Sequence, residues 1–480
     1  MKNSPLVAAV TLAAAFLFSP PSATADDRPH IVLMMADDMG WGQTGYYDHP
    51  ILETPHLDAM AANGLRFDRF YAGAPNCSPT RASVMTGRSN DRTGVLNHGY
   101  ALHRQETTIA QLLSDAGYVT GHFGKWHLNG IRGPGVPILA DDDHGPGAFG
   151  FEEWLSVTNF FDRDPLLSRN GEFEEFEGDS SEIAIDEALK FIDRHREGDR
   201  PTFSVIWFGT PHSPFVTADD DKAAFSELDA SSADHYGELV AMDRGIGTLR
   251  ARLREMGIAE NTLFWFNSDN GGLPKITPET VGGLRGFKGD IFEGGLRVPG
   301  IVEWPAVIQQ ARVTEFPAAT MDILPTLVDV TGIAADSLPQ PIDGISLRPL
   351  FEAEIETREK PIPFRHQGRA ALVDNRYKLV SKDFARGEFQ LYDLEADPKE
   401  SEDISAVKPE IFQKLRETFE NWNASVEASQ QGADYPDGKI DSRYPLRRFW
   451  TEMPEYAPYF KAWSRRPEYA SRFKAKKKKP

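Results

Sequence analysis

The stretch HIVLMMADD, residues 30–38, decides the fold of this chain. Residues 30–36 are almost all apolar, which is the pattern of a β-strand buried on both faces of a parallel sheet. Strand-like runs recur at residues 118–123, 203–208 and 262–266. Helical patterns separate these runs, and strands that alternate with helices are typical of a doubly wound α/β domain. We therefore expect a large mixed or mostly parallel sheet that is flanked by helices.

The sequence after about Pro363 has a different pattern. Short apolar runs at residues 370–373, 377–380 and 390–394 predict an antiparallel sheet, and residues 411–426 predict an amphipathic helix. We interpret this part as a smaller C-terminal α+β subdomain. The expected division is a signal peptide over 1–25, a catalytic domain over 26–362, the C-terminal subdomain over 363–465 and a basic flexible tail over 466–480.

The N-terminus has the features of a secretory signal peptide. Lys2 precedes an apolar run over residues 6–18, and Ala-Thr-Ala at 23–25 resembles a cleavage site. The run is short for a membrane span, although an uncleaved anchor is the alternative. We expect an exported protein, periplasmic or secreted, with no membrane attachment after cleavage.

The charge and the cysteine content limit the functions that are possible for this protein. The chain carries 72 acidic and 52 basic residues, a net charge of −20, which argues against nucleic acid as a partner. An anionic substrate would need a local cluster of positive groups. Exported proteins normally use cysteines in disulfides, but Cys77 is the only cysteine here. It is either an inert buried thiol or a residue retained for its chemistry.

Polar residues follow the predicted buried strands at the point where each strand ends. The carboxyl ends of such strands meet at one edge of a sheet, where ligands bind. Each residue alone is explained as well by a turn, a cap or a solvated side chain, but together they would form one site. Carboxylates with a carboxamide suit a hard cation such as Ca²⁺, and Mg²⁺ less well, while lysine and histidine bind a tetrahedral oxyanion. The residues are Asp37, Asp38, Lys125, His127, His212, Asp269 and Asn270.

Residues 74–88, APNCSPTRASVMTGR, contain the pattern C-x-P-x-R from Cys77 to Arg81, followed by Ala-Ser and Thr-Gly-Arg. This stretch resembles the signature of the formylglycine-dependent sulfatases, the arylsulfatase-like type I sulfatases of the alkaline phosphatase superfamily. A second family signature is matched around Gly124-Lys125-Trp126-His127. The resemblance also includes Asp37-Asp38, Gly286-Phe287-Lys288 and the run Leu-Tyr-Asp-Leu at 391–394.

The resemblance implies that Cys77 is oxidised during export, by a formylglycine-generating maturation enzyme, to an aldehyde whose hydrate is the nucleophile. It also implies a Ca²⁺ site, with Mg²⁺ as the alternative. The implied metal ligands are Asp37, Asp38, Asp269, Asn270 and the product of Cys77.

The resemblance also implies roles for the remaining site residues. Arg81 would hold the hydrated aldehyde, Lys125 would bind the sulfate, and Asp269 would accept the proton of the attacking hydroxyl. His127 would deprotonate the second hydroxyl. His212 would protonate the leaving alcohol with help from Lys288, and the sequence leaves open which of these two donates the proton.

Two other functions compete with a sulfatase. The first is a phosphatase or phosphodiesterase of the same superfamily, and the second is an inactive module that binds sulfated glycans. The second predicts that at least one site position is lost, and none is lost. We expect the substrate to be a sulfated carbohydrate, and the aromatic residues Trp154, Phe160 and Phe161 either stack on a sugar ring or belong to the core.

Overall fold

The computed structural model describes residues 28–474 of the 480-residue chain. The predicted signal peptide, residues 1–25, and the last six residues of the predicted tail, 475–480, lie outside the described residues.

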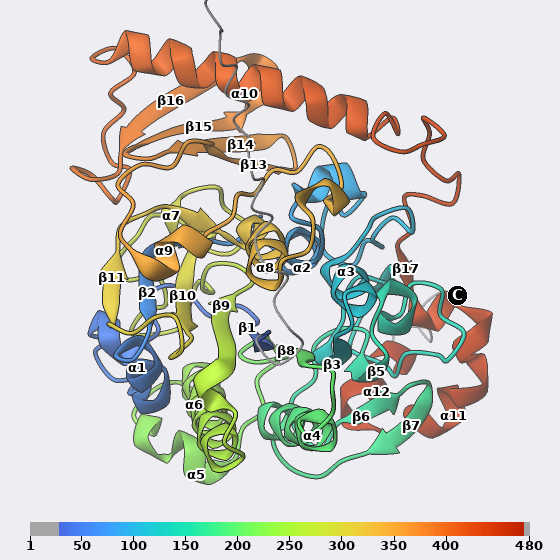
Figure 1. The fold of residues 1–480 in the computed structure, drawn as a ribbon. Helices are drawn as coiled ribbons and strands as arrows, with labels where there is room; N and C mark the ends of the chain where they lie inside the picture. Colours follow the sequence, from blue (N-terminus) through green and yellow to red (C-terminus); the bar gives the residue numbers. More distant parts are fainter. Residues whose placement is uncertain (1–27, 475–480) are drawn as a thin grey trace, which may run out of the picture.

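A large mixed sheet forms the centre of the protein (Figure 1). The order of ten of its strands is β11-β2-β10-β9-β1-β8-β3-β5-β6-β7, and β12 pairs with β2. The central strands β9, β1, β8, β3 and β5 are parallel, while β10, β6 and β7 pair antiparallel with their neighbours. The sheet confirms the predicted doubly wound α/β class. Its strands are β1 His30–Ala36, β2 Leu65–Tyr71, β3 Val119–Lys125, β5 Glu153–Val157, β6 Leu166–Arg169, β7 Glu172–Glu175, β8 Thr202–Trp207, β9 Thr262–Ser268, β10 Arg297–Glu303, β11 Arg312–Thr314 and β12 Ala318–Ala319.

Helices cover both faces of this sheet because the side chains of its buried strands alternate between two apolar cores. On β1, Ile31 and Leu33 pack in one core, and Val32 and Met34 pack in the other. Helices α2, α3, α8 and α9 line the first core, and α1, α4 and α6 line the second, with α5 packed on α6 (Figure 1). These helices are α1 Pro55–Ala61, α2 Cys77–Thr86, α3 Ile109–Asp115, α4 Ser180–His195, α5 Asp219–Lys222, α6 Ala230–Glu255, α8 Ile323–Thr331 and α9 Arg348–Glu352, while α7, Glu293–Leu296, leads into β10.

The register of the central strands places the predicted site residues side by side. Ala36, the last residue of β1, lies opposite Ser268, the last residue of β9. The next residues are held in place by backbone hydrogen bonds, because Asp37 N donates to Thr210 O at 2.8 Å and Asp269 N donates to Ala36 O at 3.0 Å. Two carboxylates therefore leave neighbouring strands at the same sheet edge.

The C-terminal part forms the predicted antiparallel sheet with a helix. One face of this sheet packs under α10, where Leu372 and Leu379 contact the apolar face of the helix around Phe419. The other face, which includes Val373 and Val380, packs against the large domain. Figure 1 shows α10 lying across this sheet at the far side from α4 and α6. The elements are β13 Ile362–His366, β14 Arg369–Asp374, β15 Tyr377–Asp383, β16 Glu388–Asp393 and α10 Pro409–Ser429.

After α10 the chain returns to the large domain. Strand β17, Arg448–Phe449, pairs in parallel with β4, Ile131–Arg132, and the helices α11, Phe460–Trp463, and α12, Pro467–Lys474, follow. The expectation of a flexible tail from residue 466 is therefore wrong for residues 467–474. They form α12 because Tyr469, which is 1% exposed, anchors them in an apolar cluster with Trp450 and Trp463.

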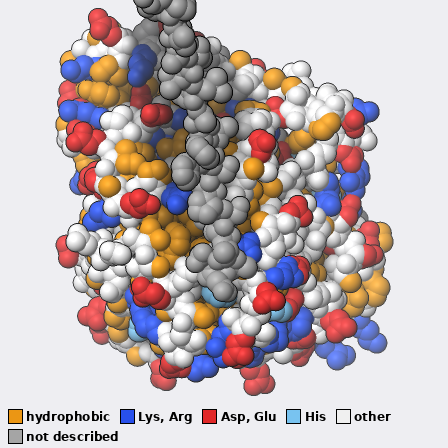
Figure 2. All heavy atoms as spheres, in the orientation of Figure 1, with side chains coloured by type: hydrophobic (Ala, Val, Ile, Leu, Met, Phe, Trp, Pro, Cys, Tyr) orange, Lys and Arg blue, Asp and Glu red, His pale blue; other side chains and the backbone are white. Residues whose placement is uncertain are grey.

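None of the helices within residues 28–474 combines the length and the apolar character that a bilayer span requires. On the face that Figure 2 shows, acidic and basic side chains are interspersed, and no broad patch of positive charge gathers there.

Candidate active site

The predicted metal ligands meet at the carboxyl ends of β1 and β9. Asp37, Asp38, Asp269 and Asn270 are all at most 1% exposed. Asp38 has a φ of 74°, and its backbone N–H donates to Asp269 Oδ1 at 3.1 Å. A left-handed conformation at a non-glycine residue is strained and persists where the surroundings hold it in place, often at functional sites.

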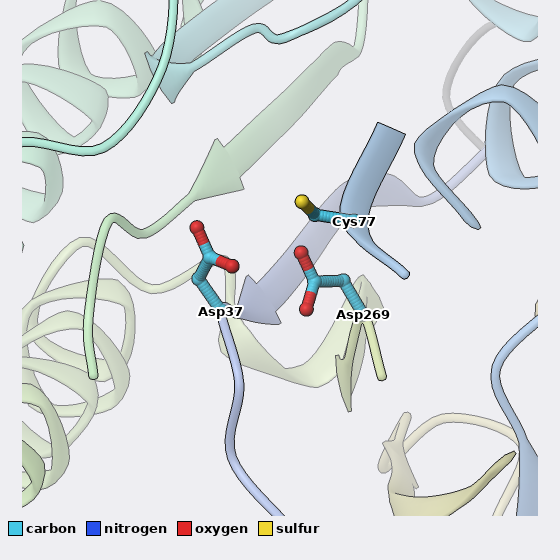
Figure 3. A group of neighbouring side chains, drawn as sticks. All are labelled: Asp37, Cys77 and Asp269. Carbon is cyan, nitrogen blue, oxygen red and sulfur yellow. The ribbon is translucent and has the colours of Figure 1, made fainter. Parts of the chain in front are cut away.

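Cys77 points at this acidic cluster from the first turn of α2. Its sulfur and the nearest carboxylate oxygens of Asp37 and Asp269 all lie within 4.8 Å of one another, and Figure 3 shows the three side chains converging. Asn76 caps the helix, because its side-chain oxygen accepts the backbone N–H of Cys77 at 2.9 Å. The thiol is only 2% exposed, and burial raises its pKa. A helix N-terminus favours negative charge that develops on the group beside it.

Other residues of the 74–88 motif hold α2 in position. The Thr80 hydroxyl donates to Ala74 O at 2.8 Å and accepts the Ala74 N–H at 3.1 Å, which closes the loop before Cys77. The Ser83 hydroxyl donates to Thr80 O. Arg88 lies away from the cluster and pairs with Asp434, beyond the end of α10. The motif therefore combines the cysteine beside the acidic cluster with residues that hold α2 in position.

Arg81 connects two halves of the site. Its guanidinium is fully buried, donates to Lys125 O at 3.0 Å and to Asp269 Oδ2 at 2.9 Å, and lies over the ring of Trp207. Such charge-assisted hydrogen bonds fix both partners in one orientation.

Two lysines neutralise the carboxylates. Lys125 Nζ donates to Asp37 Oδ2, and Lys288 Nζ lies 2.5 Å from Asp38 Oδ1. Lys125 can reach the cluster because the preceding residue, Gly124, has a φ of 104° and no room for a side chain: a Cβ there would lie 2.1 Å from Trp207 O. Burial raises the pKa of Asp37, but the positive charges of Lys125, His212, Arg81 and Lys288 together outweigh burial and hold this pKa well below its ordinary value. For Asp269, burial and the negative charge of Asp37 together raise the pKa.

Two histidines complete the predicted catalytic set. His127 is 2% exposed, has a φ of 55°, and neither ring nitrogen has a hydrogen-bond partner among the described residues. Burial, followed by the charge of Lys125, lowers its pKa far below the ordinary value, so the ring is a neutral base. His212 Nε2 lies 3.8 Å from Asp38 Oδ2, and burial and the charge of Lys288 lower its pKa to about 4.

The donor set fits a hard divalent cation. Asp37 Oδ1 and Asn270 Oδ1 are buried, and neither has a hydrogen-bond partner among the described residues. Buried oxygens without partners are costly unless something else binds them. Three carboxylates and one carboxamide form the all-oxygen set that Ca²⁺ prefers.

Four of the predicted site residues, Cys77, His127, His212 and Lys288, line a cavity of about 410 Å³. Of the three aromatic residues proposed for sugar stacking, only Phe160 lines it, with its ring stacked on His212 at 4.8 Å. Trp154 and Phe161 are at most 8% exposed and belong to the two cores. The sequence analysis did not identify the other lining residues, which come from segments without a recognisable motif: Asn76, His98, Arg132, Gly133, Asn159, Phe449 and Arg472.

Comparison with known proteins identifies the class. The family model "Sulfatase" matches residues 29–333, and the model "N-sulphoglucosamine sulphohydrolase, C-terminal" matches residues 287–425. The chain belongs to the sulfatase family and is a sulfuric ester hydrolase, as the sequence predicted.

The relatives include sulfatases of known name. N-acetylgalactosamine-6-sulfatase of Canis lupus familiaris is 33% identical over 361 residues, and the match covers 68% of this chain and 67% of the relative. Arylsulfatase A of Homo sapiens is 30% identical over 436 residues, 82% of this chain and 83% of the relative. The crystal structure of Ps i-CgsB superposes with a TM-score of 0.74 at 26% identity and covers 82% of this chain and 92% of that one.

Proposed function

We propose that this protein is an exported sulfatase that hydrolyses sulfate esters of a carbohydrate through a formylglycine made from Cys77, with a divalent cation at the acidic cluster. The observation that carries this proposal is the position of Cys77. The cysteine of the sulfatase motif lies at the N-terminus of α2, and its sulfur is within 4.8 Å of oxygens of Asp37 and Asp269. An inert core thiol would not need two carboxylates beside it.

The acidic cluster would hold the cation through Asp37, Asp38, Asp269 and Asn270. A bound divalent cation polarises sulfate oxygens and favours ionisation of a hydroxyl beside it, and the hydrated aldehyde supplies that hydroxyl as the nucleophile. The cation would also neutralise Asp37 and Asp38. Lys125 and Lys288, which pair with these carboxylates, would then be available to the sulfate.

The protein's own residues orient and transfer protons. Arg81 lies on α2, four residues after position 77, and donates a hydrogen bond to Asp269. This bond fixes the position of Asp269 relative to the side chain at position 77. Asp269, whose pKa is raised, accepts the proton of the attacking hydroxyl. His127, a buried neutral imidazole, accepts the second proton when the sulfate leaves.

His212 and Lys288 act on the leaving alcohol. Burial lowers the pKa of Lys288, but the negative charges around it, that of Asp38 first, together outweigh burial and keep the ammonium protonated. The His212 Nδ1–H donates to Ser213 O at 2.6 Å, which directs Nε2 to the Asp38 side. A bound sulfate ester brings negative charge that raises the pKa of His212. We assign the proton donation to His212, with Lys288 stabilising the charge on the bridging oxygen.

The substrate class and the location complete the proposal. The relatives include N-acetylgalactosamine-6-sulfatase, and one structural neighbour was crystallised with its substrate D-glucosamine-2-N,6-O-disulfate. The signal-peptide pattern at residues 1–25 supports export to the periplasm or the medium. Both observations support a sulfated carbohydrate met outside the cytoplasm.

Mass spectrometry of the tryptic peptide 70–81 tests the modification. Protein made with a formylglycine-generating enzyme should show CHO in place of CH₂SH at Cys77 and should hydrolyse nitrophenyl sulfate. The Cys77→Ala variant should fold with the same melting temperature and should be inactive. An unmodified thiol in an active enzyme would contradict the proposal. Faster turnover of a matched phosphate ester would favour the phosphoesterase alternative instead.

A further inference from the structure

Two arginines lie against one phenylalanine at the rim of the catalytic cavity. The guanidinium carbon of Arg132 is 4.5 Å from the centre of the Phe449 ring, and that of Arg472 is 5.4 Å from it. Arg132 belongs to β4, Phe449 to β17 and Arg472 to α12. All three line the cavity that contains Cys77. The return of the chain after α10 therefore brings positive charge to the site.

These two arginines have no acidic partner among residues 28–474. Neither side chain donates a hydrogen bond or forms an ion pair there, and each has only the Phe449 ring as its recorded contact. Arg81 in the same site, by contrast, is paired with Asp269. In a chain with 72 acidic residues, two unpaired guanidinium groups beside a substrate cavity indicate a binding function.

A third cation reinforces the positive charge at this rim. Arg447 donates to His98 O at 3.0 Å and to His98 Nε2 at 3.1 Å. His98 Nε2 is therefore an acceptor, and this ring is not available as a proton donor to substrate. The bonds also hold Arg447 beside the cavity without neutralising its charge.

The cavity between these cations and Cys77 has the features of a sugar site. Asn159 is 6% exposed, its Nδ2 donates to Gly133 O at 2.7 Å, and its Oδ1 is buried without a partner among the described residues. That oxygen can accept a hydroxyl hydrogen. Phe160, stacked on His212, adds an apolar surface for a ring face.

We propose that Arg132 and Arg472 bind a second anionic group of the substrate, a carboxylate or another sulfate, while Asn159 accepts a hydroxyl of the sugar between the two anions. This inference rests on the proposed sulfatase function and narrows its substrate to acidic saccharides with at least two negative groups. Guanidinium groups match both anions, because their planar N–H donors bind two oxygens at once.

The test compares substrates with one and two anionic groups. Wild-type enzyme and the variants Arg132→Gln, Arg472→Gln and Arg132→Lys are assayed on nitrophenyl sulfate, on a neutral sugar monosulfate, and on matched sugars that carry an added carboxylate or an added sulfate. The control variant is Arg448→Gln, which removes the same charge from β17 at an exposed residue that does not line the cavity.

We expect the wild type to prefer a substrate with two anions. Each glutamine variant should raise KM for that substrate by about tenfold or more, the effect of losing a hydrogen bond between charged groups. KM and kcat for nitrophenyl sulfate should not change, Arg132→Lys should restore part of the loss, and Arg448→Gln should resemble the wild type. The added group that gives the larger loss identifies the second anion.

Two results would overturn the inference: equal wild-type activity on the one-anion and two-anion sugars, or a uniform loss on every substrate including nitrophenyl sulfate. Failure of the proposed sulfatase function looks different, because the wild type would then not hydrolyse nitrophenyl sulfate at all. Melting temperatures of the variants separate misfolding from lost binding.

Discussion

The ammonium group of Lys288 lies 2.5 Å from Oδ1 and 2.7 Å from Oδ2 of Asp38. This contact keeps Lys288 protonated in a partly buried position, and Asp38 also lies 3.8 Å from His212 Nε2. One carboxylate therefore adjoins both groups that we propose to act on the leaving alcohol. Removing either group should have an effect that depends on how much the leaving group needs a proton.

The variants His212→Ala and Lys288→Ala should lose more activity on alkyl sulfates than on nitrophenyl sulfate. General acids contribute about 10²- to 10⁴-fold to a rate, but a nitrophenolate leaves without a proton and loses less. The measurement is kcat on both substrates, and Lys399→Ala, an exposed lysine, is the control. Equal losses on the two substrates would show that neither residue acts as an acid. A greater dependence on the leaving group in His212→Ala would support its assignment as the proton donor.

The acidic cluster should bind a divalent cation in a way that is measurable without turnover. In protein freed of metal by a chelator, added Ca²⁺ should raise the melting temperature, since a ligand at a hundredfold excess over Kd stabilises by about 2.7 kcal/mol. Asp38→Asn should weaken this response, while Asp219→Asn, an exposed carboxylate on α5, should keep it. The same Ca²⁺-dependent shift in wild type and Asp38→Asn would mean that the cation binds elsewhere. Titration with Mg²⁺ should give a smaller shift because the cluster suits larger cations better.

His103 should make the stability depend on pH. Its Nδ1 lies 2.9 Å from the Tyr435 hydroxyl, which donates to Glu106 at 2.6 Å. These hydrogen bonds connect the segment that follows α10 to the large domain. Burial, and then the charge of Arg88, lower the pKa of His103 to about 4. In the unfolded chain, His103 has its ordinary pKa of about 6.5. The unfolded state therefore takes up the proton more readily than the folded state. The contribution of His103 to the free energy of unfolding is fully present above about pH 6.5 and is lost as the pH drops toward 4.

Replacing His103 with Asn, which keeps a hydrogen-bonding side chain, should flatten this dependence. Between pH 7 and pH 5 the wild type should lose about 2 kcal/mol more of its free energy of unfolding than His103→Asn does. Urea unfolding at the two pH values measures the difference. If the free energy of unfolding changes with pH in the same way in both proteins, His103 does not cause the pH dependence.

The catalytic centre was more predictable than the wall of its cavity, and the reason is physical. Strands buried on both faces leave long apolar runs, so β1 and β9 and the polar residues after them were found directly. Strand β2 was missed because it carries Arg66 and Asp68 among its apolar residues, and β10 because Pro299 interrupts it. β10 pairs antiparallel with both β2 and β9, and strands in antiparallel pairs have a less continuous apolar pattern.

No comparable sequence pattern predicted the residues of the cavity wall. Arg132 lies in a Gly/Pro-rich segment, and Arg472 lies in a region that composition alone marked as a solvated tail. They meet because a two-residue strand, β17, pairs with the equally short β4, and α12 then packs on the same side. A contact between residues this far apart in the sequence depends on tertiary packing that no local pattern encodes.

The pairing of β17 with β4 brings the end of the polypeptide to a cavity whose other lining residues come from the first 290. The candidate catalytic residues all lie within the first 290 residues, whereas Phe449 and Arg472 join the cavity from the far end of the polypeptide. Substitutions in that distal segment could therefore change which sugars are accepted while the sulfur-oxygen chemistry stays intact.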